Sequence, residues 1–109
     1  MLKVTVLYGH PQDPAAFDHY YAEVHTPLAL TMPGLKGFTV GKAATTNPNE
    51  PSPYYLIANL YVDSLEAFQA TMASPAGQAT VADLHNFASG GVTILLSEEL
   101  VLIPVSLTK

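Results

Sequence analysis

The sequence contains no cysteine. This absence excludes disulfide bonds, thiolate metal sites, iron–sulfur clusters and a cysteine nucleophile, because each of them needs a thiol. The absence does not fix the cellular compartment. Any chemistry that the chain supports therefore has to rest on other side chains.

Arginine is also missing, and positive charges are few. Nine acidic residues stand against four lysines, which gives a formal net charge of −5 at pH 7. Binding of nucleic acid depends on Lys and Arg side chains that neutralise phosphates, so this balance argues against a nucleic-acid partner. Without arginine the chain also lacks the usual bidentate clamp for phosphate or carboxylate groups. A neutral or apolar small molecule suits this composition better.

Charge of either sign is scarce. Charged residues make up 12% of the chain and hydrophobic residues 49%, whereas about 25% charged is usual for a globular domain. A chain of 109 residues closes one hydrophobic core, so we expect a single domain over residues 1–109. The shortage of polar surface indicates either a membrane protein or a second apolar face that contacts another copy.

The membrane alternative does not fit the distribution of apolar residues. The best candidate for a span, residues 91–105, is interrupted by Glu98 and Glu99, and a spanning helix needs about 20 mostly apolar residues. No secretory signal fits the first residues either. We therefore expect a cytoplasmic homo-oligomer with no membrane partner.

Apolar runs and turn residues predict four strands, with helical segments after the first and after the third. The strands are expected at residues 2–9, 35–45, 54–62 and from residue 92 onward, with a possible short fifth strand after Glu98 and Glu99. The order βαββαβ is that of the ferredoxin-like fold. We therefore predict an α+β protein in which helices cover one face of an antiparallel sheet.

The first helix is expected to begin at Asp13 and Pro14, a good pair for an N-cap and a first helical position. At about 100° per residue its core-facing stripe consists of Phe17, Tyr21, Val24 and Leu28. Asp18 and His25 lie on the flank of this stripe, where a side chain contacts both core and solvent. Pro27 removes the N–H that would bond the preceding turn, so the helix must kink or end near His25.

The later helical segment is predicted from two start signals. Asp63 is followed three residues later by Glu66, which is the pattern of a capping box. Ser74 before Pro75 then begins a further helix. The buried face of this segment is expected to hold Leu65, Phe68, Met72, Val81, Leu84 and Phe87.

The strand at residues 54–62 is apolar on both of its faces. One face carries Tyr55, Ile57, Asn59 and Tyr61, and the other carries Tyr54, Leu56, Ala58, Leu60 and Val62. An antiparallel sheet with one open face normally exposes polar side chains there. The pattern therefore predicts a homodimer in which two sheets meet face to face and curl into a dimeric α+β barrel.

Four stretches of the chain resemble the EthD family of the dimeric α+β barrel superfamily. They are FDHYYAEVHTPLA, MPGLKGFTV, YYLIANLYVDSLEAF and SPAGQATVADLHNF, and the resemblance runs from about residue 2 to residue 99. Its most specific part is the run Phe17, Tyr20 or Tyr21, His25, Pro27 and Leu28, followed by Pro33 and Gly34. The resemblance implies the fold, dimerisation and a site at His25. It assigns no reaction, since related barrels include cofactor-free monooxygenases, muconolactone isomerases and haem-degrading enzymes.

His25 is the candidate catalytic residue, because an imidazole with a pKa of about 6.5 serves as acid or base near neutral pH. The alternative is that His25 only secures the helix break by donating to a carbonyl. Asp18, seven residues earlier, is a candidate orienting residue for the imidazole. The alternative for Asp18 is a solvated surface charge.

Tyrosine and asparagine side chains supply candidate substrate-binding groups. Tyr8, Tyr21, Asn59 and Tyr61 are the residues that could direct polar groups into a cavity of the barrel. Asn59 is the strongest of them, because an amide in an apolar strand has to find partners. The alternative for the tyrosines is that each hydroxyl is satisfied locally while the ring packs.

We expect neither a metal nor another cofactor. The four histidines, His10, His19, His25 and His85, have no recognisable ligand spacing. Haem ligation by a single histidine remains an alternative.

Two functional hypotheses remain open, and with them whether the protein is an enzyme. The first is cofactor-free proton-transfer, isomerase or monooxygenase chemistry at His25 on a small, mostly apolar, oxygenated or aromatic compound, in degradation or secondary metabolism. The second is a non-catalytic dimeric carrier of such a compound for a partner oxygenase. A weaker third possibility is a barrel filled by aromatic side chains. Residues 100–109 are a candidate segment for pairing with the other subunit.

Overall fold

A computed structural model describes residues 1–105 of the chain. Along the sequence its elements are β1 (Leu2–Tyr8), α1 (Pro14–Tyr20), the π-helical turn η1 (Tyr21–His25), α2 (Thr26–Ala29), β2 (Gly37–Lys42), β3 (Leu56–Val62), α3 (Leu65–Ala73), α4 (Pro75–Asp83), the 3₁₀ turn η2 (Leu84–Asn86) and β4 (Val92–Glu98). The predicted order of strands and helices is confirmed. The strands are shorter than predicted at residues 35–45 and 54–62.

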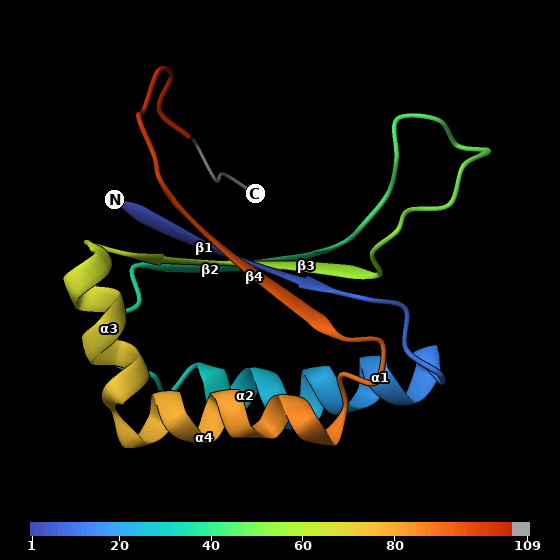
Figure 1. The fold of residues 1–109 in the computed structure, drawn as a ribbon, viewed down its shortest axis with the longest axis horizontal. Helices are drawn as coiled ribbons and strands as arrows, with labels where there is room; N and C mark the ends of the chain where they lie inside the picture. The colour runs from blue at the N-terminus through green and yellow to red at the C-terminus, as the bar shows by residue number, and fades with distance from the viewer. Residues whose placement is uncertain (106–109) are drawn as a thin grey trace.

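The four strands form one antiparallel sheet in the order β2-β3-β1-β4. All helices lie on one side of it (Figure 1), which confirms the ferredoxin-like α+β fold. Alternate residues of β1 are buried against this helical layer, namely Leu2, Val4, Val6 and Tyr8. Their partners Val62, Leu60, Ala58 and Leu56 on β3 continue the same face. The core therefore lies between the sheet and the helices.

The predicted helix starts need one correction. Ser64, not Asp63, is the N-cap of α3, because its hydroxyl accepts a hydrogen bond from the N–H of Ala67. Ser74 caps α4 as expected, and its hydroxyl accepts from the N–H of Gly77.

Two predicted core contacts are wrong, since the side chains of Leu65 and Val81 are 47% and 48% exposed. Leu65 is exposed because α3 stands at one end of the sheet (Figure 1), and Val81 is exposed because α4 turns another face to the core. The face that α4 buries holds Gly77, Thr80 and Asp83 instead.

The second face of the sheet carries no helix (Figure 1). Side chains that point to it include Lys3, Thr5 and Leu7 of β1, with their partners Tyr61, Asn59 and Ile57 of β3. The loop between β2 and β3 and residues 99–105 rise on this side of the sheet. Residues 99–105 contain no fifth strand, and the last four residues of the predicted pairing segment lie outside the described residues.

Candidate functional site

Pro27 follows a wide helical turn instead of a helix end. In η1 the N–H of Thr26 donates to the carbonyl of Tyr21, five residues back, where an α-helix would use the residue four back. The extra residue moves every later side chain by one position around the helix. The buried line therefore runs through Phe17, Tyr21, His25 and Ala29.

The predicted stripe is wrong after Tyr21 for this reason. Val24 is 43% exposed, and His25 takes the buried place that regular α-helical spacing gave to Val24. The side chain of His25 is directed into the core and is 4% exposed. The helical backbone continues through α2 to Ala29, so the break expected near His25 is a change in hydrogen bonding within a continuing helix.

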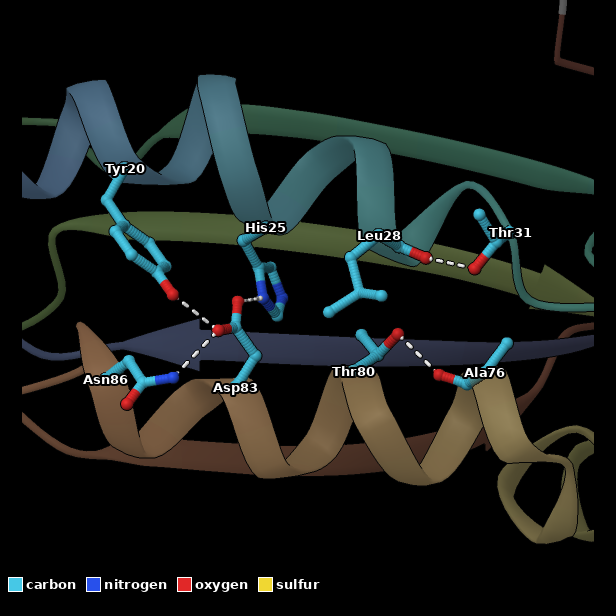
Figure 2. Close-up of polar contacts among 8 residues, drawn as sticks. All are labelled: Tyr20, His25, Leu28, Thr31, Ala76, Thr80, Asp83 and Asn86. Carbon is cyan, nitrogen blue, oxygen red and sulfur yellow. Dashed lines mark hydrogen bonds and ion pairs between the residues drawn. The ribbon is translucent and has the colours of Figure 1, made fainter.

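Asp83, at the end of α4, is the partner of His25. Nδ1 of His25 lies 3.0 Å from Oδ2 of Asp83, and both residues are buried. The carboxylate projects from α4 into the space between Tyr20 and His25 of the facing helical segment (Figure 2). Sequence reasoning missed Asp83. The available signal was a carboxylate on one helical face with Thr80 and Phe87, which lie three residues before and four residues after it.

The other oxygen of Asp83 is held by two further donors. The hydroxyl of Tyr20 donates to Oδ1 at 2.5 Å, and the amide nitrogen of Asn86 donates to the same oxygen at 3.0 Å. Figure 2 shows these bonds meeting at the carboxylate. Asp83 therefore accepts three hydrogen bonds, which satisfies a buried charge that would otherwise be costly.

The pKa shifts agree with a charged Asp83 beside a neutral His25. Burial would raise the pKa of Asp83, but hydrogen bonds from Tyr20, Asn86 and His25 together bring it below its ordinary value. Burial lowers the pKa of His25, and the attraction of Asp83 offsets this only in part. Near neutral pH the imidazole is thus uncharged, and its one proton lies on Nδ1, where the carboxylate accepts it. Among residues 1–105 the hydrogen bond of His25 is made by Nδ1, so the lone pair of Nε2 is left to act as an acceptor.

A small cavity lies between the sheet and the helices beside His25. Its volume is about 60 Å³, roughly the share of two water molecules in the liquid at about 30 Å³ each. Apart from His25, Thr80 and two tyrosines its walls are apolar and include Val4, Val6, Ala29, Met32, Ala58, Met72 and Ile94. The cavity can therefore take only a few non-hydrogen atoms without movement of its walls.

Tyr8 and Tyr21 line this cavity together with His25. Burial raises the pKa of Tyr21 to about 12. Burial, followed by the interactions with Tyr21, also raises the pKa of Tyr8. Both hydroxyls therefore stay protonated at neutral pH and can donate to an oxygen of a bound molecule.

The other predicted binding residues lie elsewhere. Asn59 and Tyr61 are on the open face of the sheet, on the opposite side from the cavity. The amide oxygen of Asn59 accepts a hydrogen bond from the hydroxyl of Thr5 at 3.0 Å. The structure thus brings Tyr8, Tyr21 and His25 together and separates Asn59 and Tyr61 from them.

Asp18 does not orient His25, which corrects the prediction. Its carboxylate accepts hydrogen bonds from Nζ of Lys42 at 2.9 Å and from the hydroxyl of Tyr55 at 2.8 Å. These bonds lower the pKa of Asp18. The physical reason is again the wide turn, because the extra residue rotates His25 away from the helix face of Asp18.

Residues 1–105 contain neither a cluster of metal-binding side chains nor a membrane-spanning helix. In that part of the chain, no three His, Asp or Glu side chains come close enough together to hold a metal ion. None of its helices is long and apolar enough to cross a membrane.

The strand order and the single helical layer define a ferredoxin-like α+β protein. A family model of the EthD domain matches residues 9–91, so the chain belongs to the EthD family. An uncharacterized 11.0 kDa protein of Rhodococcus erythropolis, encoded between thcB and thcC, is 46% identical over 104 residues, which are 95% of this chain and all of that protein.

Solved structures agree with this assignment. The crystal structure of an EthD family protein from Bacillus halodurans is 34% identical, with a TM-score of 0.85 over 92% of this chain and 99% of that one. A ferredoxin-like protein of unknown function from Thermobifida fusca, described as dimeric, shares the fold at 13% identity, with a TM-score of 0.66 over 88% of each chain.

Proposed function

We propose that this EthD family protein binds a small, mostly apolar, oxygenated compound in the cavity and that His25 transfers a proton to and from it. The observation that carries the proposal is the buried pair of His25 and Asp83 beside an apolar cavity. The carboxylate keeps the proton on Nδ1, so that Nε2 acts as a general base. The hydroxyls of Tyr8 and Tyr21 supply hydrogen bonds to the oxygen of the ligand.

A carbonyl compound illustrates the step. Nε2 of His25 takes a proton from the carbon next to the carbonyl group, the electron pair of that C–H bond forms a C=C bond, and the π electrons of the carbonyl group move to its oxygen. The enolate oxygen accepts a hydrogen bond from a tyrosine hydroxyl, and the imidazolium returns a proton to carbon. No oxidant or cofactor takes part in this exchange.

The cavity has to widen for such a ligand. Met32 and Met72 line it, and methionine side chains are unbranched and flexible, so they can adjust to different shapes. This supports a binding site that adapts to its ligand.

Cyclopentanone in D₂O tests the proposal, because loss of its α-protons is followed directly by NMR. The wild-type protein should accelerate deuterium incorporation above the buffer rate. His25→Gln should reduce the protein-dependent rate by roughly 100-fold or more. His19→Gln, a change at an exposed histidine of α1, is the matched control and should leave the rate unchanged. Equal rates for wild type and His25→Gln would refute the role of His25.

The carrier hypothesis rests on the almost wholly apolar walls of the same cavity. A carrier binds the compound and returns it unchanged. Saturable binding of cyclopentanone, seen as shifts of the cavity methyl signals, without accelerated exchange would favour the carrier over the enzyme.

A further inference from the structure

The hydrogen-bond network of Asp83, which consists of His25, Tyr20 and Asn86, extends from the core of the protein to its surface. At the inner end, His25 borders the apolar cavity. At the outer end, Tyr20 and Asn86 border a second hollow of about 280 Å³, whose other walls include Asp13, His85 and Ser89. The ring of Phe87 separates the two ends, with its centroid 5.3 Å from that of Tyr20 and 4.6 Å from that of His25. Asp83 therefore connects the apolar cavity to a second hollow whose wall contains polar and charged side chains.

The two carboxylate oxygens of Asp83 have different hydrogen-bond partners. Among residues 1–105, Oδ2 accepts from His25 alone, while Oδ1 accepts from Tyr20 and Asn86. Two donors on Oδ1 prevent the carboxylate from turning about its terminal bond, so Oδ2 stays aimed at Nδ1. They also draw negative charge toward Oδ1, which weakens the attraction that Asp83 exerts on a proton of His25.

We propose that Tyr20 is a positioning residue that acts through Asp83 and keeps His25 an uncharged base near neutral pH, with its proton on Nδ1. This inference rests on the proposed function of His25. The hydrogen bond from Tyr20 is the shortest of the three to Asp83, so its loss should change the carboxylate most.

The other titratable groups near the imidazole are few. Tyr21 lies on the same helical segment, with its ring centroid 5.4 Å from that of His25, and Tyr8 of β1 packs against Tyr21. Both are neutral phenols near pH 7. Among the described residues, Asp83 of α4 is thus the charged group that acts on the pKa of His25. The hydroxyl of Tyr20 in turn donates a hydrogen bond to Asp83.

Two substitutions should move the pKa of His25 in opposite directions. Tyr20→Phe removes one donor from Oδ1 while Asn86 still holds this oxygen in place, so more charge faces Nδ1 and the pKa of His25 should rise. Asp83→Asn removes the charge, so the pKa should fall. The difference between the two variants should be about 1 pH unit or more. A merely structural role of Tyr20 predicts no such opposition.

The measurement is an NMR titration of the full chain labelled with ¹⁵N-histidine, which reports both the midpoint and the tautomer of each imidazole. Tyr54→Phe is the matched control, because Tyr54 is a half-buried tyrosine outside the network, and it should leave His25 unchanged. Asn86→Ala removes the other donor at an exposed position and should shift the midpoint upward as Tyr20→Phe does. This second variant tests the same step if Tyr20→Phe does not fold.

An unchanged midpoint in Tyr20→Phe, or a shift in the same direction as in Asp83→Asn, would overturn the inference. The titration needs no substrate, so its result is independent of whether cyclopentanone exchange is found. Opposite shifts without any exchange activity would support the positioning role while removing the proposed reaction. Exchange activity with an unchanged midpoint in Tyr20→Phe would support the proposed reaction and remove the positioning role of Tyr20.

Discussion

At the scale of single residues, the buried imidazole of His25 links stability to pH. Burial holds the pKa of His25 below the ordinary 6.5, so the unfolded chain takes up this proton at a higher pH than the folded chain does. The free energy of unfolding should therefore decrease as the pH falls from about 6.5 toward the folded-state pKa, and this contribution should be fully present above about 6.5. Urea denaturation across that range measures it. His25→Gln should lack this part of the slope, and a wild-type protein that becomes more stable on acidification through the range would contradict the assignment.

Removal of the Asp83 carboxylate should destabilise the fold. Asp83→Ala leaves the donors of His25, Tyr20 and Asn86 without their acceptor, and an unsatisfied buried polar group costs about 1–3 kcal/mol. Asp63→Ala is the control, since that side chain is 64% exposed and surface changes stay within roughly 0.5 kcal/mol. Equal free energies of unfolding for the two variants would mean that the network contributes nothing to stability.

The sequence allowed only one partner of this network to be predicted. His25 stands out because it is close to a proline in an apolar helix, and the family resemblance adds to that. Asp83 is 58 residues away, so its partnership depends on how α4 packs against the first helical segment, which no local pattern states. Asp18 was predicted in its place because it is seven residues from His25, and regular α-helical spacing puts such residues on one face.

At the scale of elements, the wide turn η1 makes a deletion experiment informative. Removal of Glu23, an exposed residue inside η1, takes out the extra residue. His25 and Ala29 then follow Tyr21 at three and seven positions, which is α-helical spacing of one buried face. Pro27 opposes an uninterrupted α-helix, so the deletion should be tolerated best together with Pro27→Ala. We expect this double variant to lose less than about 1.5 kcal/mol of stability.

The matched control is deletion of Ala82, an exposed residue of α4, where no wide turn can absorb the change. This deletion rotates Asp83 by about 100° around the helix and should cost more than roughly 3 kcal/mol. Circular dichroism and thermal unfolding compare the two. If the Glu23 deletion with Pro27→Ala unfolds as readily as the Ala82 deletion, the wide turn is not a removable insertion.

The order of strands and helices along the chain could be predicted because each element has a local sequence signal. Examples are the alternation of buried residues in β1 and the Ser74–Pro75 start of α4. The wide turn η1 could not be predicted, because α-helical spacing was assumed for the apolar residues from Phe17 to Leu28. Pro27 marked where the hydrogen bonding had to change, but not that the chain would stay helical. One added residue then decided which side chain faces the core.

At the scale of the whole molecule, apolar side chains remain exposed after the sheet and helices have packed. Beyond β4, Leu100, Leu102, Ile103 and Val105 are each at least 80% exposed. The loop between β2 and β3 and residues 99–105 rise on the helix-free side of the sheet (Figure 1). Large apolar patches of this kind usually mark an interface. Together with the low charge of the chain, these exposed apolar side chains favour the predicted homodimer.

Sedimentation equilibrium tests the dimer and its two contact surfaces separately. The full chain should be a dimer, because burial of the open face of the sheet and of residues 100–105 removes apolar surface from water. Ile57→Lys introduces a charge on the open face and should yield monomer, whereas Leu30→Lys, at a helical position that is 64% exposed, should not.

A chain that ends at Glu99 should dissociate at least about tenfold more readily, a loss of about 1.4 kcal/mol. If this shorter chain associates as tightly as the full chain, residues 100–109 have no part in the interface. If the full chain is a monomer, the apolar surfaces have another partner and the homodimer is excluded.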